Sequence, residues 1–358
     1  MITIKEAKTK KEMTDFVKFP FELYKDNPNW IPPIINDELA GFDPKVNPAF
    51  EKAEAYFYIA YQNNKMVGRT AAIINWSEVN DQNKKKVRFG WFDVIDDIEV
   101  TKALLEKVYE LGRKHKLENV EGPMGFSNLD KVGCLTEGFD QIGTMITWYN
   151  NAYYKDHFEQ LGFVKEKQFL ESHFPFSNVG EAYIKADELI RRRYELTSKT
   201  FTSTKAIMPY VDEMFDIFNS AYAKLSSFVA VSESQKEFFK KKYISLINPE
   251  YIKFVMDKNN RIVAFSIVMP DFSEALKKAN GKLFPFGFLH LLKAKKHSKS
   301  VLFYLIGILP EYQNKGVTAI IMKEYYDTFS KKGITECIRT PELDENHSIH
   351  IYGKTLIR

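Results

Sequence analysis

The sequence predicts a mixed α/β protein with two domains in tandem. Its 358 residues are more than twice the roughly 150 of an average domain, so each half can bury a core of its own. Hydrophobic residues make up 44% of the chain and charged residues 27%, which is typical of a globular protein. Strand-like and helix-like segments alternate in both halves, and this order favours a sheet covered by helices in each half.

In the first half, two runs rich in β-branched and aromatic residues, 56–61 and 66–74, flank a polar segment. This arrangement predicts a β-hairpin. Apolar residues that recur every three or four positions predict a helix over 100–115. The other elements expected in this half are strands at 3–5, 86–94, 120–124 and 164–174 and helices at 11–24 and 152–161.

A charged stretch, 181–199, separates the halves and is expected to form a linking helix. We therefore predict an N-terminal domain at 1–176, a linker at 177–200 and a C-terminal domain at 201–358. Further elements expected in the second half are strands at 201–206, 251–257, 261–269, 301–309 and 334–339 and helices at 211–223, 234–246, 316–331 and from 346.

Charge and cysteine content exclude several classes of protein. The net charge of +4 is too small to predict nucleic-acid binding. The two cysteines, Cys134 and Cys337, exclude a disulfide framework and a cysteine-rich zinc site. The seven histidines form no HxH or HxxxH pair, so no metal is expected. Without a signal sequence, or an apolar run near the roughly 20 residues of a membrane span, we expect a cytoplasmic protein without a transmembrane segment.

Residues 308–319 read Ile-Leu-Pro-Glu-Tyr-Gln-Asn-Lys-Gly-Val-Thr-Ala and carry the main chemical signal. A buried strand ends at Pro310, and a loop with Gln313 and Gly316 opens directly onto an amphipathic helix. The first N–H groups of a helix are unpaired and its dipole favours negative charge there, while glycine leaves room for a phosphate. The segment predicts a pyrophosphate site, with the alternative that the glycine only permits the turn.

The order of strand, Pro310, Gln313-x-x-Gly316-x-Thr318 and helix resembles motif A of the GNAT acyl-CoA N-acyltransferases, written Q/R-x-x-G-x-G/A. In that family the loop amides bind the coenzyme A pyrophosphate and the preceding strand pairs with pantetheine. Thr318 departs from the family's Gly or Ala and would crowd the phosphate. The resemblance implies cofactor-binding roles for Ile306, Ile308, Gln313, Asn314, Lys315, Gly316, Val317 and Thr318.

The same resemblance implies two further roles on the last helix. Asn346 would lie against pantetheine, and Tyr352 would be the catalytic acid that protonates the leaving thiolate. Their spacing of six is one residue shorter than the family's, and packing is the alternative role for Tyr352. An ordered water chain is one alternative for the general base. The candidate carboxylates are Glu336, Glu342, Asp344 and Glu345.

The N-terminal half resembles the same fold but lacks the phosphate loop. Its corresponding strand enters the next helix without a glycine, and Asp96, Asp97 and Glu99 would repel a pyrophosphate. It keeps the family's closing element at 153–163, whereas the C-terminal half stops soon after its last helix begins. The whole chain therefore resembles a tandem GNAT protein, in which one half binds the cofactor and the other supports it.

This resemblance implies an N-acyltransferase without a metal. An acyl group, most simply acetyl, would pass from acetyl-CoA or another acyl-CoA to an amine of a small molecule or peptide, by direct attack in a ternary complex. Two alternatives stay open. One is a non-catalytic binding protein with the GNAT fold. The other is an enzyme similar to the tandem-domain aminoacyl transferases, which would use aminoacyl-tRNA.

An insertion at 281–300 joins an aromatic cluster to four lysines. As a lid, it would turn Phe284, Phe286 and Phe288 toward the cofactor strand and its lysines toward water. Alternatively, 282–299 would contact an anionic membrane surface. Pro285 and Gly287 predict a loop first and a helix only from about Leu289.

Overall fold

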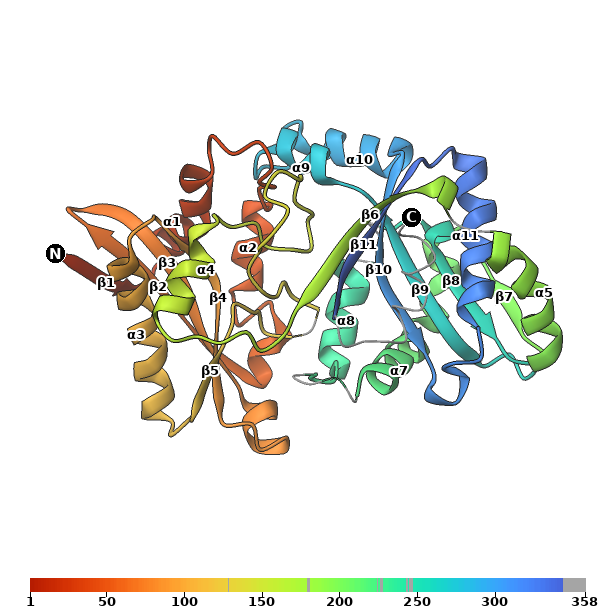
Figure 1. Cartoon of the computed structure of the whole chain (residues 1–358), viewed down its shortest axis with the longest axis horizontal. Coiled ribbons are helices and arrows are strands. Elements are labelled where there is room, and N and C mark those ends of the chain that lie inside the picture. Colours follow the sequence, from red (N-terminus) through yellow and green to blue (C-terminus); the bar gives the residue numbers. More distant parts are fainter. Residues whose placement is uncertain are drawn as a thin grey trace. The chain divides into compact units, whose positions relative to one another are not determined.

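The computed structural model describes residues 1–343 except 128, 179, 180, 224, 226, 227, 243, 245 and 246. It divides into two compact units (Figure 1). Unit 1 comprises Met1–Lys165 and Ser273–His290, and unit 2 comprises Glu166–Phe272 and Leu291–Arg358. Each unit holds a mixed sheet with helices, which confirms the predicted fold class.

Unit 1 contains a five-stranded sheet in the order β1-β2-β3-β4-β5. Neighbouring strands are antiparallel except β4 and β5, which are parallel. The predicted hairpin is confirmed, and Asn63 and Asn64 form its turn with φ of 50° and 61°. The strands are β1 (Ile2–Glu6), β2 (Ala53–Gln62), β3 (Lys65–Asn75), β4 (Lys86–Val94) and β5 (Asn119–Glu121).

Both faces of this sheet are buried. Side chains alternate along β3, so Ile74 packs into one core with helix α3 while Ile73 packs into the other with helix α1. The helices of this unit are α1 (Lys10–Leu23), α2 (Ile35–Gly41), α3 (Ile98–Lys114), α4 (Tyr153–Gln160) and α9 (Ser273–Ala279), with short helical turns η1 (Pro48–Glu51) and η2 (Ser77–Asp81). The division between the units falls within α10 (Gly287–His297).

A segment from late in the sequence completes unit 1. The Ser273 hydroxyl donates to the Gly143 carbonyl (3.1 Å), and the Ile35 amide donates to the Gly281 carbonyl (3.0 Å). A Cβ at Gly281 would lie 2.6 Å from the ring of Phe21, so the close packing here requires glycine.

Unit 2 contains a six-stranded sheet in the order β6-β11-β10-β9-β8-β7, in which only the β10–β11 pair is parallel. Its strands are β6 (Phe169–Pro175), β7 (Thr197–Lys199), β8 (Ile252–Met256), β9 (Ile262–Pro270), β10 (Ser300–Ile308) and β11 (Glu336–Leu343). Its helices are α5 (Glu181–Tyr194), α6 (Thr204–Ile207), α7 (Val211–Tyr222), α8 (Glu233–Lys242) and α11 (Thr318–Lys332), with short turns η3 (Phe176–Asn178), η4 (Met208–Tyr210), η6 (Pro249–Tyr251) and η7 (Pro310–Tyr312).

Strand β6 departs from the sequence prediction. The strand predicted at 164–174 was expected to be the last of the N-terminal domain, but β6 pairs antiparallel with β11, with Phe174 opposite Cys337. This pairing covers an edge of β11 that would otherwise expose unpaired backbone groups. The two units consequently differ in their bounds from the domains predicted at 1–176 and 201–358.

The segment expected to link the domains is part of unit 2. Helix α5 packs beside α11, where Arg191 Nη2 lies 3.0 Å from Glu324 Oε1. The strand expected at 201–206 does not form, because Ser203 caps helix α6 through a hydrogen bond to the Ala206 amide.

Candidate functional site

The loop between β10 and α11 has the predicted form. Strand β10 ends at Ile308, and α11 begins at Thr318 without a side-chain cap from its N-cap residue Val317. Among the described residues, the amides of Asn314, Gly316 and Val317 have no hydrogen-bond acceptor. Such N–H groups at a helix N-terminus can bind a phosphate.

The structure also explains Gly316 without a ligand. Its φ of 76° is in the left-handed region, and a Cβ there would lie 3.1 Å from Ile190 Cδ1 on α5. Both the turn and the packing against α5 thus require glycine. The neighbouring Lys315 Nζ lies 4.9 Å from the ring centre of Tyr312 and 5.3 Å from that of Tyr194. These cation–π contacts hold the positive charge of Lys315 at the loop.

Beside this loop, β10 and β11 separate. Their parallel pairing runs from Ser300 opposite Glu336 to Phe303 opposite Arg339, whereas β10 continues to Ile308. The pairing of β10 with β9 is irregular between Phe303 and Leu305. We call residues 305–308 the open half of β10, because they pair with β9 and have no register partner on β11. The resemblance to motif A would place pantetheine along this open half.

Two side chains bind the backbone of the open half. Tyr222 Oη donates to the Ile306 carbonyl oxygen (2.9 Å), and Gln313 Nε2 donates to the Ile308 carbonyl oxygen (3.1 Å). Gln313 therefore folds the loop back onto its own strand. A carbonyl oxygen has two lone pairs, so Ile306 and Ile308 keep the capacity for a second hydrogen bond.

Tyr222, the last residue of α7, was not predicted as a site residue. Burial raises its pKa to about 12, and the Glu342 carboxylate adds to the shift. The phenol therefore stays protonated at neutral pH and can donate a proton. Because 84 residues separate it from Ile306, no local sequence pattern marks it.

Glu342 lies beyond the strand predicted at 334–339, but in the structure it is part of β11. The strand is irregular between Arg339 and Glu342 and then continues, with Glu342 opposite Leu170. Glu342 Oε2 lies 3.6 Å from Arg339 Nη1, and both side chains are largely buried. This places a carboxylate near the Tyr222 hydroxyl.

Other predicted site residues have different outcomes. Asn346 and Tyr352 lie outside the described residues, as do the candidate bases Asp344 and Glu345. Glu336 is exposed at the start of β11. No group of His, Cys, Asp or Glu in the described part of the chain is suited to hold a metal ion.

The N-terminus of α3 in unit 1 corresponds to that of α11 but differs from it in charge. Asp97 caps α3, and its side chain accepts a hydrogen bond from the Glu99 amide (3.0 Å). A carboxylate therefore already occupies the position that would bind a phosphate. Asp96 lies 3.2 Å from His157 Nε2 and adds a second negative charge.

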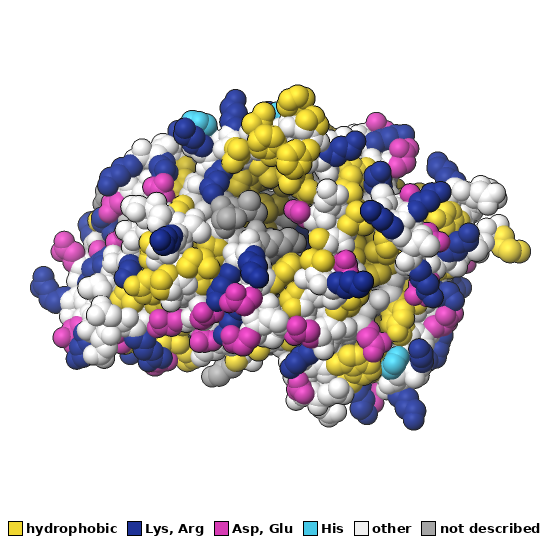
Figure 2. All heavy atoms as spheres, turned by 180° about the vertical axis from the view of Figure 1, so that it is seen from behind, with side chains coloured by type: hydrophobic (Ala, Val, Ile, Leu, Met, Phe, Trp, Pro, Cys, Tyr) yellow, Lys and Arg dark blue, Asp and Glu magenta, His cyan; other side chains and the backbone are white. Residues whose placement is uncertain are grey.

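The insertion at 281–300 does not have the geometry expected of a lid. Phe284 is 78% and Phe286 68% exposed, so the expectation that these rings are covered is wrong. Gly287 approaches the Lys282 carbonyl so closely that a Cβ would lie 1.9 Å from its oxygen, and this tight turn leaves the two rings outside. Figure 2 shows a hydrophobic patch at the top, where α10 lies in Figure 1. No described helix combines the length and hydrophobicity that a bilayer span requires.

Comparisons with known proteins establish the fold. No model of a known protein family matches the chain. It is 26% identical over 336 residues to Protein YghO of Escherichia coli (strain K12), covering 91% of this chain and 84% of that protein. It is 24% identical over 320 residues to the bacterial ceramide synthase of Caulobacter vibrioides, covering 87% and 82% of the two chains.

A tandem GNAT protein from the clavulanic acid biosynthesis pathway superposes with a TM-score of 0.54 at 10% identity, covering 99% of this chain and 94% of that one. The chain therefore has a GNAT-like fold with two domains.

Proposed function

We propose that this protein is an N-acyltransferase that moves an acyl group from an acyl-CoA to an amine. The observation that carries the proposal is the start of α11, where the amides of Asn314, Gly316 and Val317 have no acceptor among the described residues and lie beside the open half of β10. A pyrophosphate needs such amides, and an extended pantetheine arm needs an unpaired strand edge. Both features lie in unit 2.

In this proposal the loop residues hold the donor. The amides of Asn314, Gly316 and Val317 bind the pyrophosphate, and Lys315 adds positive charge. The backbone of Ile306 and Ile308 binds pantetheine. Gln313 stabilises the loop through its hydrogen bond to the Ile308 carbonyl of β10, rather than by contact with the ligand.

Tyr222 and Glu342 supply the proton transfers. The amine nitrogen attacks the thioester carbonyl carbon, a C–N bond forms, and the C–S bond breaks. Rotation of the Tyr222 hydroxyl away from the Ile306 carbonyl lets it give its proton to the departing sulfur. Glu342, directly or through water, takes the proton that the amine loses. The products are an amide and the free thiol of coenzyme A.

For the acceptor we propose a long-chain lipid amine within the class of small-molecule amines. A ceramide is an amide of a fatty acid and a long-chain amino alcohol, and one relative is named a ceramide synthase. The exposed apolar surface supports this choice, because an enzyme that uses such a substrate must meet it at a membrane. Four apolar side chains on one continuous segment are exposed: Phe284, Phe286, Leu289 and Leu292.

We propose that this segment docks on an anionic membrane surface. Lys293, Lys296 and Lys299 are exposed on the same segment as its apolar side chains. Phenylalanine and leucine enter the boundary between headgroups and acyl chains, and lysine pairs with anionic lipids. The proposed partner is therefore the lipid surface.

The testing experiment supplies the purified protein with acetyl-CoA or palmitoyl-CoA and with sphinganine presented in phosphatidylglycerol vesicles. We expect an N-acyl product by mass spectrometry and release of one coenzyme A thiol per product. A long-chain diol that lacks the amine is the control acceptor. Acylation of the diol but not of sphinganine would overturn the proposal of N-acylation.

Two outcomes would instead favour the alternatives. Coenzyme A binding without any turnover would indicate a non-catalytic binding protein. Transfer from aminoacyl-tRNA, without transfer from any acyl-CoA, would indicate an aminoacyl transferase.

A further inference from the structure

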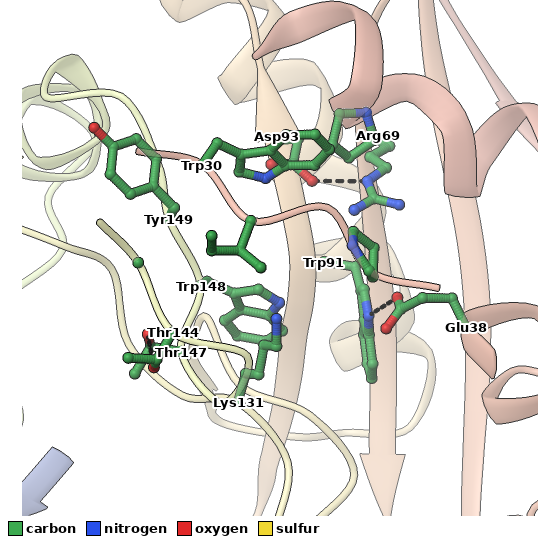
Figure 3. A pocket seen from close by; sticks show the side chains of 14 residues that line it. Trp30, Glu38, Arg69, Trp91, Asp93, Lys131, Thr144, Thr147, Trp148 and Tyr149 are labelled. Atoms are coloured by element: carbon green, nitrogen blue, oxygen red, sulfur yellow. Dashed lines mark hydrogen bonds and ion pairs between the residues drawn. The ribbon is translucent and has the colours of Figure 1, made fainter. Parts of the chain in front are cut away.

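Unit 1 contains a pocket that the proposed acyl transfer does not use (Figure 3). It lies beside β3 and β4, and the loops around residues 30 and 147 form much of its wall. Four aromatic side chains line it: Trp30, Trp91, Trp148 and Tyr149. Such a lining favours a ligand with a flat or apolar body.

A bulge in β4 gives the pocket its shape. Arg69 pairs with Asp93 and Ala71 with Gly90, so β4 has an extra residue between these pairs. Trp91, within the bulge, has a φ of 44° in the left-handed region. Bulky residues rarely adopt this conformation, and it concentrates at sites that bind ligands.

The carboxylates of the pocket already have donors. Asp93 accepts hydrogen bonds from Tyr24 Oη (2.9 Å) and Arg69 Nε (2.7 Å), one on each oxygen. Glu38 Oε2 accepts a hydrogen bond from Trp91 Nε1 (2.9 Å). Both oxygens of Asp93 are therefore engaged within the protein.

The cations of the pocket, in contrast, have unused donors. Lys131 extends beside Trp148 into the pocket (Figure 3), and its Nζ makes no hydrogen bond or ion pair with any described residue. Arg69 Nη2 likewise donates to none of the residues that the structure describes. Burial lowers the pKa of Lys131, with a smaller effect of Arg69 in the same direction, while Glu38 and Asp93 oppose the shift. The Lys131 side chain is half-buried, and an anionic ligand in the pocket would give its ammonium the acceptor that the described residues do not supply.

We propose that this pocket binds a small carboxylate with a flat apolar body, its carboxylate paired with Lys131 and its body between Trp30, Trp91 and Trp148. An ammonium ligand would meet Lys131, and it would find both oxygens of Asp93 and one oxygen of Glu38 already occupied. The proposal rests on unit 1 alone and does not depend on the proposed acyl transfer.

Three probes with the same phenyl body test the charge preference: phenylacetate, phenethyl alcohol and phenethylamine. All four tryptophans of the chain, at positions 30, 76, 91 and 148, lie in unit 1, so tryptophan fluorescence reports on this unit. We expect saturable quenching by phenylacetate at one site per chain, and weaker or no binding of the other two. Binding of phenethylamine in preference to phenylacetate, or no binding of phenylacetate at millimolar concentration, would overturn the proposal.

Lys131→Met removes the charge and keeps most of the side-chain volume. It should weaken phenylacetate binding at least roughly tenfold, since it removes a charge-assisted contact. The matched control is Lys102→Met, on the exposed side of α3, which should leave the affinity unchanged. Unchanged phenylacetate affinity in a folded Lys131→Met protein would contradict the assigned role of Lys131.

Proton linkage gives a readout that does not need a variant. The pKa of Lys131 is lowered in the free protein, and a bound carboxylate would raise it. At a pH above the pKa that Lys131 has in the free protein, binding of the carboxylate should therefore take up protons. Calorimetry in two buffers of different ionisation enthalpy measures this uptake, and proton release on binding would contradict the proposal.

Discussion

Tyr222 Oη donates a hydrogen bond of 2.9 Å to the carbonyl oxygen of Ile306. This contact brings the last residue of α7 to the open half of β10, the strand that we propose as the binding edge for pantetheine. In the proposed reaction, this contact would give the leaving thiolate a protonated phenol as its proton donor.

The first prediction is that Tyr222→Phe lowers kcat roughly a hundredfold with a smaller change in KM, because it removes the proposed acid. Steady-state kinetics measure the effect, with thermal unfolding to confirm that the variant folds. Tyr251→Phe is a matched control, since burial also raises the pKa of this phenol to about 12. If Tyr222→Phe keeps full kcat, Tyr222 has only a structural role.

The second prediction concerns the phosphate loop. Asn314→Asp adds a negative charge at a residue with φ of 61° and should weaken coenzyme A binding roughly tenfold or more. Gly316→Asp tests the loop less cleanly, because its side chain would also collide with Ile190. Isothermal calorimetry measures the affinity.

Asn260→Asp is the matched control for this loop. Asn260 is exposed, has a φ of 60° and lies in the turn between β8 and β9. Equal losses of affinity in the two variants would show a general charge effect and remove the loop from the proposal.

The third prediction concerns the membrane. Replacing Phe284 and Phe286 together by serine should reduce partitioning onto phosphatidylglycerol vesicles at least roughly tenfold, because two exposed rings are lost. Added salt should weaken the binding of the unmodified protein. Vesicle sedimentation measures both effects.

Leu189→Ser is the control for surface hydrophobicity, since Leu189 is exposed on α5 away from this segment in the sequence. Absence of vesicle binding by the unmodified protein would contradict the docking proposal. That result would not decide the acyl-transfer proposal, which the N-acyl product assay tests separately.

The fourth prediction concerns the stability of unit 1. Asp93→Ala leaves Arg69 buried without its partner and should lower the free energy of unfolding by about 3–5 kcal/mol. Asp97→Ala, which removes only a helix cap, should cost about 1 kcal/mol. Urea titration followed by tryptophan fluorescence compares them, and similar losses would contradict the importance of the buried pair.

Local features of the structure could be predicted from the sequence. The hairpin turn at Asn63 and Asn64 and the loop from Gln313 to Thr318 depend on residues close together in the chain. Glycine, asparagine and proline determine their backbone shape directly.

Long-range pairing could not be predicted in the same way. Apolar alternation marks a strand but does not identify its neighbour, so β6 was assigned to the wrong sheet. Lys131 was missed for a related reason. Its position in the pocket becomes visible only once the fold brings Trp91, Trp148 and Glu38 around it.

The position of β6 also bears on how such chains can recombine. A crossover near residue 200, between the predicted domains, would give unit 2 a foreign β6 opposite its own β11. A crossover near residue 165 would transfer the strand together with its sheet. Chimeras of related chains should therefore fold better with a crossover near residue 165 than near residue 200, because the first keeps β6 and β11 from the same parent.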